Sequence, residues 1–181
     1  MNVITRKEAE KYLGISIENG DPVDILIGIT SARLAEFCGR DDWGPATERT
    51  EYFDGNTGML LAKVWPLVSV VSINDDPEHD WDADTVIDAT SYHAGSMGVI
   101  YYEYGKFLAG NESIKLVYTG GYANEAAIPS KVKKAALTQL KNDRLGNQIV
   151  TQPLEFGTPV DDGLLPEVIA LMQPFVRRVM F

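Results

Sequence analysis

The chain has 181 residues, a length typical of one domain, or of one domain and an inserted subdomain. Its residues are 45% apolar and 23% charged, which is the composition of an ordinary soluble globular protein. Sixteen basic and 26 acidic side chains give a net charge of −10, which argues against a primary nucleic-acid binder and against docking on anionic lipid. One cysteine and two histidines exclude a disulfide framework and a multi-thiolate zinc site, and they leave little material for a histidine-based metal site.

Charge is spread unevenly along the chain. The net charge is −4 over residues 1–48, −8 over residues 49–128 and +2 over residues 129–181. This asymmetry indicates either a protein whose two ends face different partners or random variation of surface charge. The opening residues carry charges where a secretion signal needs an apolar run, and no stretch reaches the about 20 apolar residues of a membrane span. We therefore expect no membrane partner and a protein that resides or assembles inside the cell.

Two helices are predicted before residue 40. Thr5 and Glu8 form a capping box that begins a helix over residues 5–14, and Gly14 ends it. Asp21-Pro22 begins a second helix over residues 22–38, which Gly39 ends. Apolar residues at helical spacing predict its buried stripe: Ile25, Leu26, Ile29, Ala32, Ala35, Phe37 and Cys38.

The spacing of apolar residues changes from helical to β-like at Arg49 and back at Pro129. About five to seven short strands are predicted, from candidates at residues 50–53, 59–63, 68–73, 85–87, 91–94, 99–102 and 114–119. Asp54-Gly55-Asn56 predicts a hairpin between the first two strands. Residues 68–73 are apolar on both faces, which predicts a central strand. Short strands with no helix between them favour an antiparallel sheet or a small sandwich.

A third helix is predicted over residues 129–145, ending near Gly146. Proline and glycine interrupt residues 147–163, and a last helical segment runs from Pro166 to about Val176. The predicted fold class is therefore α+β. A small helical bundle comprises residues 1–48 and 129–146, an antiparallel β subdomain is inserted at residues 49–128, and residues 147–181 form an extended C-terminal arm with a terminal helix.

No sequence pattern indicates catalysis or a bound metal. The acidic run at residues 75–84 fails as a calcium loop, because counting from Asp80 the required glycine and glutamate positions hold Thr85 and Ser91. Cys38 lies on the apolar stripe and is interpreted as a core residue, and His93 as a structural or surface residue. We expect no enzyme, no cofactor, and no catalytic, cofactor-binding or metal-binding residue.

Two groups of residues are candidates for partner binding. Lys131, Lys133 and Lys134 lie in the first turn of the third helix and form either a solvated face or a surface for an acidic partner. The chain ends with apolar anchors beside arginines, which is the composition of a binding hot spot: Phe175, Arg177, Arg178 and Phe181. This ending docks either on the chain itself or on a neighbour, and removing the chain from Leu165 onward is expected to leave a folded monomer.

Five motifs follow one another over nearly the whole chain. They are Ile4-Thr5-x-x-Glu8-Ala9-x-x-Tyr12-Leu13; Asp24–Arg40 with its ending Glu36-Phe37-Cys38-Gly39-Arg40; Trp65-Pro66-Leu67-Val68-Ser69-Val70; Tyr118-Thr119-Gly120-Gly121-Tyr122 followed by Ile128-Pro129-x-x-Val132-Lys133-x-Ala135; and Leu164-Leu165-Pro166-Glu167-Val168-x-x-Leu171-Met172-x-Pro174-Phe175-x-Arg177-Arg178. In this order and spacing they resemble the head–tail connector (adaptor) family of tailed phages. One departure is that residues 147–163 are Pro-rich and mildly acidic, where the family has a basic or polar loop.

The resemblance implies a structural virion protein, located in the neck and assembled in the host cytoplasm. Such proteins form a ring, usually of twelve copies, that docks on the portal protein, extends the DNA channel and carries the stopper or tail. DNA passes through without sequence-specific binding, and the C-terminal region contacts the portal or a neighbouring subunit. Two alternatives remain: another neck or tail module, such as a head closure or tail completion protein, and an enzyme or carbohydrate-binding module.

Overall fold

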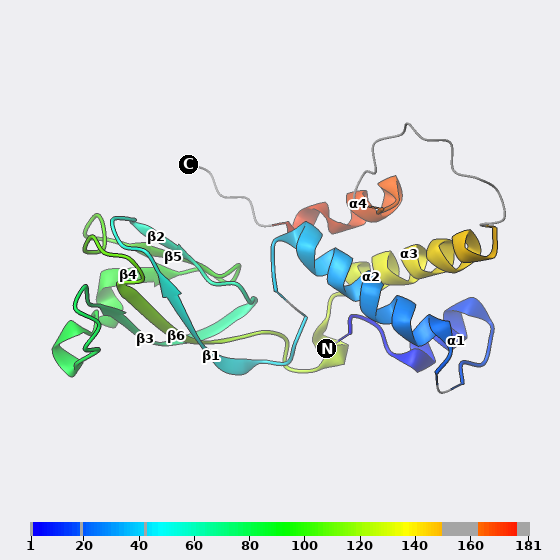
Figure 1. Cartoon of the computed structure of the whole chain (residues 1–181), viewed down its shortest axis with the longest axis horizontal. Helices are drawn as coiled ribbons and strands as arrows, with labels where there is room; N and C mark the ends of the chain where they lie inside the picture. Colours follow the sequence, from blue (N-terminus) through cyan, green and yellow to red (C-terminus); the bar gives the residue numbers. More distant parts are fainter. Residues whose placement is uncertain (1, 19, 42, 150–162, 177–181) are drawn as a thin grey trace. The chain divides into compact units, whose positions relative to one another are not determined.

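The computed structural model describes residues 2–18, 20–41, 43–149 and 163–176 (Figure 1). The chain divides into two compact units. The helical unit comprises Met1–Trp43 and Glu125–Phe181, and the β unit comprises Gly44–Asn124. The fold class is α+β, as predicted, with the β unit inserted between helices.

The described part of the helical unit contains the helices α1 (Arg6–Leu13), α2 (Pro22–Cys38), α3 (Ser130–Ile149) and α4 (Pro166–Met172). α3 packs against each of the other three. The predicted caps are present: Glu8 N–H donates to the Thr5 hydroxyl, and Gly14 and Gly39 end their helices at φ 68° and 67°. Among the described residues, none of the helices combines the length and the apolar character that a membrane span requires.

α3 is longer than predicted. It was expected to end near Gly146, but it continues to Ile149. A glycine inside a helix costs about 1 kcal/mol relative to alanine, which is too little to end a helix whose preceding turns are packed. Val132, Ala135, Ala136 and Leu140 are all fully buried and hold those turns.

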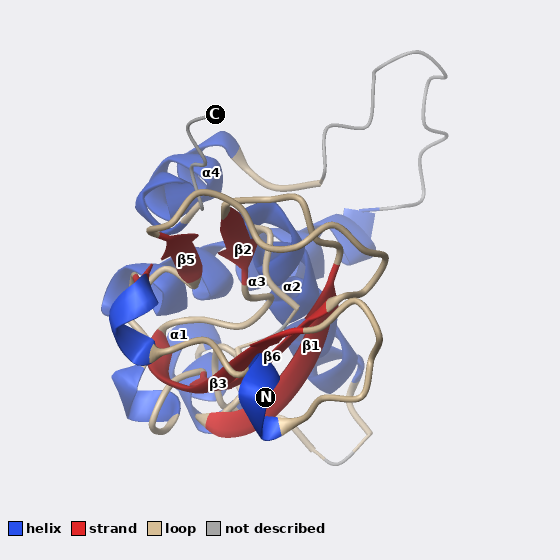
Figure 2. Cartoon of the chain, turned by 90° about the vertical axis from the view of Figure 1, so that its left-hand side faces the viewer, coloured by secondary structure: helices blue, strands red, loops and turns tan. Residues whose placement is uncertain are grey.

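The β unit consists of two three-stranded antiparallel sheets, visible as two groups of strands in Figure 2. The first has the order β1 (Thr47–Phe53), β6 (Ile114–Gly120), β3 (Leu67–Asp75), and the second has the order β2 (Met59–Leu61), β5 (Val99–Tyr102), β4 (Tyr92–Ala94). One core contains side chains of both sheets: Leu60, Ala62, Ile73, Ile100, Phe107, Ile114, Leu116 and Tyr118.

The predicted hairpin at Gly55 is wrong. β1 pairs with β6, and β2 pairs with β5, so the turn between β1 and β2 carries the chain from one sheet to the other. Gly55 is needed there for a close approach, because a Cβ at this position would lie 1.7 Å from the carbonyl oxygen of Leu108. Gly55 is therefore explained by its contact with Leu108, which is distant in sequence, and not by a hairpin turn.

Two further strand predictions are corrected. β6 is the central strand of its sheet and β3 lies at the edge, where Val68 and Val71 are 61% and 56% exposed. Residues 85–87 form no strand, since a 3-10 turn at Ala83–Thr85 is followed by one isolated bridge from Val86 to Asn74. An apolar run on both faces is thus not sufficient evidence for a central strand.

The chain passes from the helical unit to the β unit between Trp43 and Gly44, and the contacts of these two residues show it. The Trp43 indole N–H donates to the Ser31 carbonyl at 3.0 Å, and the Arg40 guanidinium lies 4.1 Å from the centroid of the Trp43 rings. The next residue, Gly44, accepts a backbone hydrogen bond from Tyr122 at 3.2 Å. Trp43 therefore belongs to the helical unit and Gly44 to the β unit.

Candidate partner-binding surfaces

The first turn of α3 carries the three lysines that the sequence selects for partner binding. Lys131 and Lys134 are exposed, whereas Lys133 is half-buried. The Lys133 ammonium donates a 2.6 Å hydrogen bond to Oε1 of Glu8 in α1. The three lysines therefore differ in their surroundings: Lys131 and Lys134 face solvent, and Lys133 holds α3 against α1.

Glu8 accepts several hydrogen bonds at this position. Its carboxylate accepts from the Thr5 N–H at 2.8 Å as well as from Lys133. Partial burial raises the pKa of Glu8, but the hydrogen bonds from Lys133 and Thr5 and the positive charge of Lys133 outweigh that effect and lower the pKa overall. The ion pair therefore stabilises the folded helical unit at neutral pH.

The helix near the C-terminus packs on the helical unit. Val168 and Met172 of α4 are fully buried. The buried Gln139 side chain in α3 donates a 2.8 Å hydrogen bond to the Gly163 carbonyl and accepts one of 2.9 Å from the Leu165 N–H. α4 is thus part of the folded unit, and the expectation that the chain folds without it stays a prediction.

The structure places one residue of the predicted C-terminal hot spot. Phe175 is half-buried in the 3-10 turn η4 (Gln173–Phe175), which follows α4 directly. Arg177, Arg178 and Phe181 lie outside the described residues.

An apolar face of α2 lies at the surface, which sequence analysis missed. Ile25 is 66% exposed and Ile29 is 41% exposed, although helical spacing placed both in the buried stripe. The apolar side chains that α2 does bury are Val23, Ile27, Leu34, Ala35 and Cys38. Because successive helix residues turn by about 100°, Ile25 and Ile29 lie about 160° from Ile27. The signal in the sequence was that α2 is apolar nearly all round, which is unusual for a helix with one solvent face.

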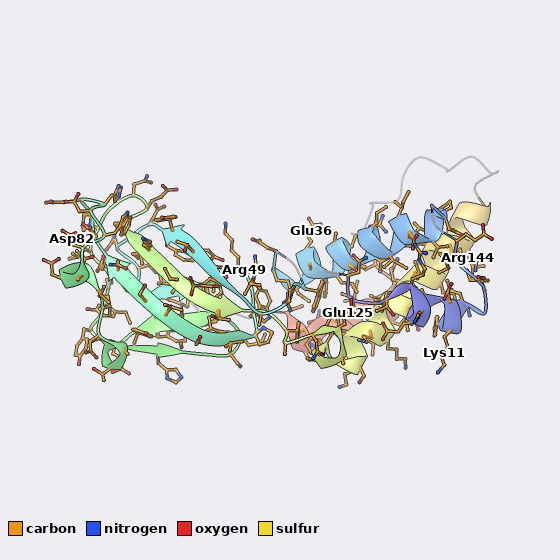
Figure 3. All side chains as sticks on the ribbon, turned by 90° about the horizontal axis from the view of Figure 1, so that it is seen from below. Lys11, Glu36, Arg49, Asp82, Glu125 and Arg144 are labelled. Atoms are coloured by element: carbon orange, nitrogen blue, oxygen red, sulfur yellow. The ribbon has the colours of Figure 1, made fainter. Side chains whose placement is uncertain are left out.

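A groove of 240 Å³ lies between the C-terminal ends of α1 and α3. Its lining residues are Tyr12, Leu13, Lys141, Arg144 and Leu145. Tyr12 and Leu145 are 45% and 48% exposed, Lys141 is exposed, and Arg144 is half-buried. Figure 3 shows Arg144 and Lys11 at the same end of the helical unit. The groove therefore combines exposed apolar walls with two cations.

The acidic segment at residues 75–84 folds around one carboxylate in the β unit. The buried Asp76 accepts hydrogen bonds from the N–H groups of Trp81 at 2.7 Å and Glu78 at 2.9 Å, and the bond from Trp81 is the largest effect that lowers its pKa. The Trp81 rings lie 5.6 Å from the Tyr52 ring and 5.6 Å from the Lys115 ammonium. The exposed acidic side chains of the segment are Glu78, Asp80, Asp82 and Asp84, of which Figure 3 labels Asp82.

Cys38 and His93 lie in unrelated surroundings. Cys38 is 1% exposed, and burial raises the pKa of its thiol to about 11, although the charge of Arg40 opposes this. A nucleophilic thiol needs the opposite shift. His93 is exposed in β4. Across the described residues, no three side chains of histidine, cysteine, aspartate or glutamate come together in a way that suits a metal ion.

No known protein family and no curated protein matches the chain. Solved structures do match in fold. A chain in the virion of a native gene transfer agent (GTA) particle aligns with a TM-score of 0.59 and 17% identity, over 98% of this chain and 92% of that one. A chain in the neck of an empty GTA particle, computed with C6 symmetry, aligns with a TM-score of 0.57 and 14% identity over 98% and 92%.

A third similar chain comes from the neck of a native GTA particle computed with C12 symmetry. It aligns with a TM-score of 0.50 and 14% identity, over 99% of this chain and 96% of that one. The likeness extends over both units of the chain, so the helical unit with its inserted β unit is a fold that also occurs in components of such particles.

Proposed function

We propose that this chain is a structural protein of a phage-like particle: one subunit of a ring in the neck that docks on the portal, extends the DNA channel and joins head to tail. The observation that carries the proposal is the likeness in fold over 98% of the chain to components of a GTA virion and neck. Necks computed with C6 and C12 symmetry support a ring of identical copies, and we propose twelve. Assembly would take place in the host cytoplasm.

The charge of the β unit suits a channel through which DNA slides. Residues 44–124 contain four basic and twelve acidic side chains, a net charge of −8. A surface of the same sign as DNA gains no affinity from counterion release, so the duplex passes without being held. This supports a channel role with no sequence-specific DNA contact.

Two surfaces are proposed for contacts with the portal, a neighbouring subunit or a stopper or tail-side protein. The exposed Lys131 and Lys134 suit an acidic partner, with Lys133 holding the turn that presents them. The C-terminal residues Phe175, Arg177, Arg178 and Phe181 form the second surface, on the composition of an apolar anchor beside arginines.

A second candidate is another neck or tail module, such as a head closure or tail completion protein. The similar chains come from a virion and from necks, and both an adaptor and a closure or completion protein belong to such assemblies. The adaptor would bind the portal directly, whereas a closure or completion protein would bind only after an adaptor is in place. An enzyme or a carbohydrate-binding module is the least supported, because the similar chains are components of a virion and of necks. The raised pKa of Cys38 counts further against an enzyme that uses a cysteine nucleophile.

Negative-stain imaging of the purified chain, alone and mixed with the portal protein of its own particle, tests the proposal. We expect rings with twelvefold symmetry seated on the portal. Absence of any complex with the portal, together with binding to portals that already carry another ring, would favour the closure or completion protein. Absence of binding in both mixtures would contradict a role in the neck.

A further inference from the structure

We propose that the outer face of α2 in one copy docks in the groove between α1 and α3 of the next copy, and that this contact repeats around the ring. The α2 outer face consists of Ile25, Gly28, Ile29, Ala32 and Glu36, and the α1–α3 groove consists of Tyr12, Leu13, Lys141, Arg144 and Leu145. The inference rests on the proposed ring and identifies the interface that would build it.

The α2 outer face presents neighbouring apolar side chains to solvent. Ile25 and Ile29 stand one turn apart at 66% and 41% exposure, and Ala32 continues the same stripe. A shallow hollow of 180 Å³ opens beside Gly28 and Ala32. Neighbouring exposed apolar side chains beside a hollow suit a contact with another protein.

Gly28 has no structural explanation within the described residues. A Cβ at this position would meet no atom within 4 Å, so nothing there prevents a larger residue. Glycine is nevertheless less favourable than alanine in the middle of a helix. A second protein surface that approaches the α2 backbone closely, beside the ridge formed by Ile25 and Ile29, would account for it.

The α1–α3 groove has the complementary chemistry. Tyr12 and Leu145 offer partly exposed apolar walls, and tyrosine and arginine are enriched where binding energy concentrates. Lys141 and Arg144 put two positive charges at the groove, whereas the α2 outer face ends in the exposed carboxylate of Glu36. The two surfaces therefore match both in apolar character and in sign of charge.

The two surfaces point in different directions from one helical unit, which selects a head-to-tail contact. α2 packs on α3, and the residues that α2 buries, Ile27 among them, lie on the side of the helix opposite to its outer face. The groove is bordered by α3 itself. A contact between two different patches is heterologous, and such contacts generate closed rings when the rotation between copies closes. A second copy of the chain is thus the occupant that both surfaces fit.

The first test compares two glutamate substitutions that change the net charge equally. Ile29→Glu puts a charge on the α2 outer face, and Leu108→Glu puts one at a 56% exposed position in the β unit. The chains assemble at high concentration, or on the portal, and rings are counted by negative stain. We expect Ile29→Glu to weaken ring formation by about tenfold or more, a loss of about 1.4 kcal/mol, and Leu108→Glu to leave it unchanged.

Gly28→Ala adds a test in which monomer stability and assembly move in opposite directions. The substitution should raise the melting temperature of the monomer by about 2–3 °C, because alanine favours the helix. It should also weaken ring formation, because the methyl group occupies the space that the neighbouring copy fills. A lower melting temperature for Gly28→Ala would mean that the chain itself fills the space beside Gly28, which would overturn the proposal.

The pairing is tested by disulfide cross-linking between two single substitutions, Ile29→Cys and Leu145→Cys. We expect a cross-link only when the two variants are mixed, because position 29 of one copy faces position 145 of the next. Rings that form normally but show 29–29 cross-links, or no 29–145 cross-link, would overturn the interface while leaving the proposed function intact. If the wild-type chain forms no rings either alone or on the portal, the proposed function fails and the interface with it.

Discussion

Lys133 in α3 donates a 2.6 Å hydrogen bond to Glu8 in α1, so a residue selected from the sequence for partner binding is held inside its own helical unit. The Glu8 carboxylate also accepts from the Thr5 N–H in the capping box, which ties the start of α1 to the first turn of α3. The two other lysines of that turn, Lys131 and Lys134, are exposed. The three lysines are therefore expected to respond differently to substitution.

Replacing Lys133 by alanine should lower the free energy of unfolding by about 0.5–1 kcal/mol, because the pair is only partly shielded from solvent. The side chains of Lys133 and Glu8 are 19% and 36% exposed. Lys131→Ala is the matched control and should change stability by less than about 0.5 kcal/mol. Urea unfolding at neutral pH measures both, and equal losses in the two variants would show that the ion pair contributes nothing.

The same ion pair predicts a loss of stability in acid. The pKa of Glu8 is lowered from its usual value of 4.5, so its contribution is complete above that value and disappears as the pH falls through the lower, folded-state pKa. Between about pH 5 and about pH 3, the wild-type chain should lose more stability than Glu8→Gln, in which no carboxylate titrates. Parallel curves for the two proteins in a pH series of urea unfolding would contradict this.

The sequence predicts the helices better than the sheets, because helix ends are set by neighbouring residues. Thr5 with Glu8, and Gly14 and Gly39 in the left-handed region, act within one turn of each helix end. Strand pairing depends on residues far apart in the chain. Gly55 was interpreted as part of a hairpin, but it is glycine because the Leu108 carbonyl lies against it.

The candidate surfaces were predicted in part, for a related reason. The three lysines of α3 are recognisable in the sequence as a charge cluster. That Lys133 is paired is not recognisable there, because its partner Glu8 lies 125 residues away in the chain. Helical spacing also placed Ile25 and Ile29 in the core, since spacing alone does not tell which of two apolar faces of a helix meets the rest of the protein. The face of α2 that stays exposed is determined by which residues the rest of the helical unit buries, Ile27 and Leu34 among them.

Tyr118→Phe should destabilise the β unit although the ring stays in place. The fully buried Tyr118 hydroxyl donates to Glu51 at 2.5 Å and accepts from the Val64 N–H at 3.1 Å. Removing it leaves a buried N–H without its acceptor, at a cost of about 1–3 kcal/mol. Tyr101→Phe, at a 49% exposed site, is the control and should be neutral. Similar melting temperatures for the two variants would show that the hydroxyl contributes nothing.

Cys38 should be inert towards thiol reagents in the native protein. It is 1% exposed, and burial raises its pKa to about 11, so little thiolate is present at pH 8 and little of it is accessible. Reaction with a chromogenic disulfide reagent should be slow in buffer and fast in urea, where the pKa returns to about 8.5. Fast reaction of the native protein would instead support a nucleophilic role and reopen the enzyme alternative.

Met172→Ala should destabilise the helical unit, because α4 belongs to its core. The Met172 side chain is fully buried, and shortening a buried methionine to alanine costs about 2–5 kcal/mol. Glu167→Ala, on the exposed side of the same helix, should be nearly neutral.

Removing the chain from Leu165 onward should reduce stability further than Met172→Ala does, because it also leaves the buried Gln139 side chain without the Leu165 N–H from which it accepts a hydrogen bond. Circular dichroism at 222 nm during thermal unfolding measures all three proteins. A truncated chain that melts at the wild-type temperature would show that α4 is dispensable for folding, and the segment from Leu165 would then act as a docking arm alone.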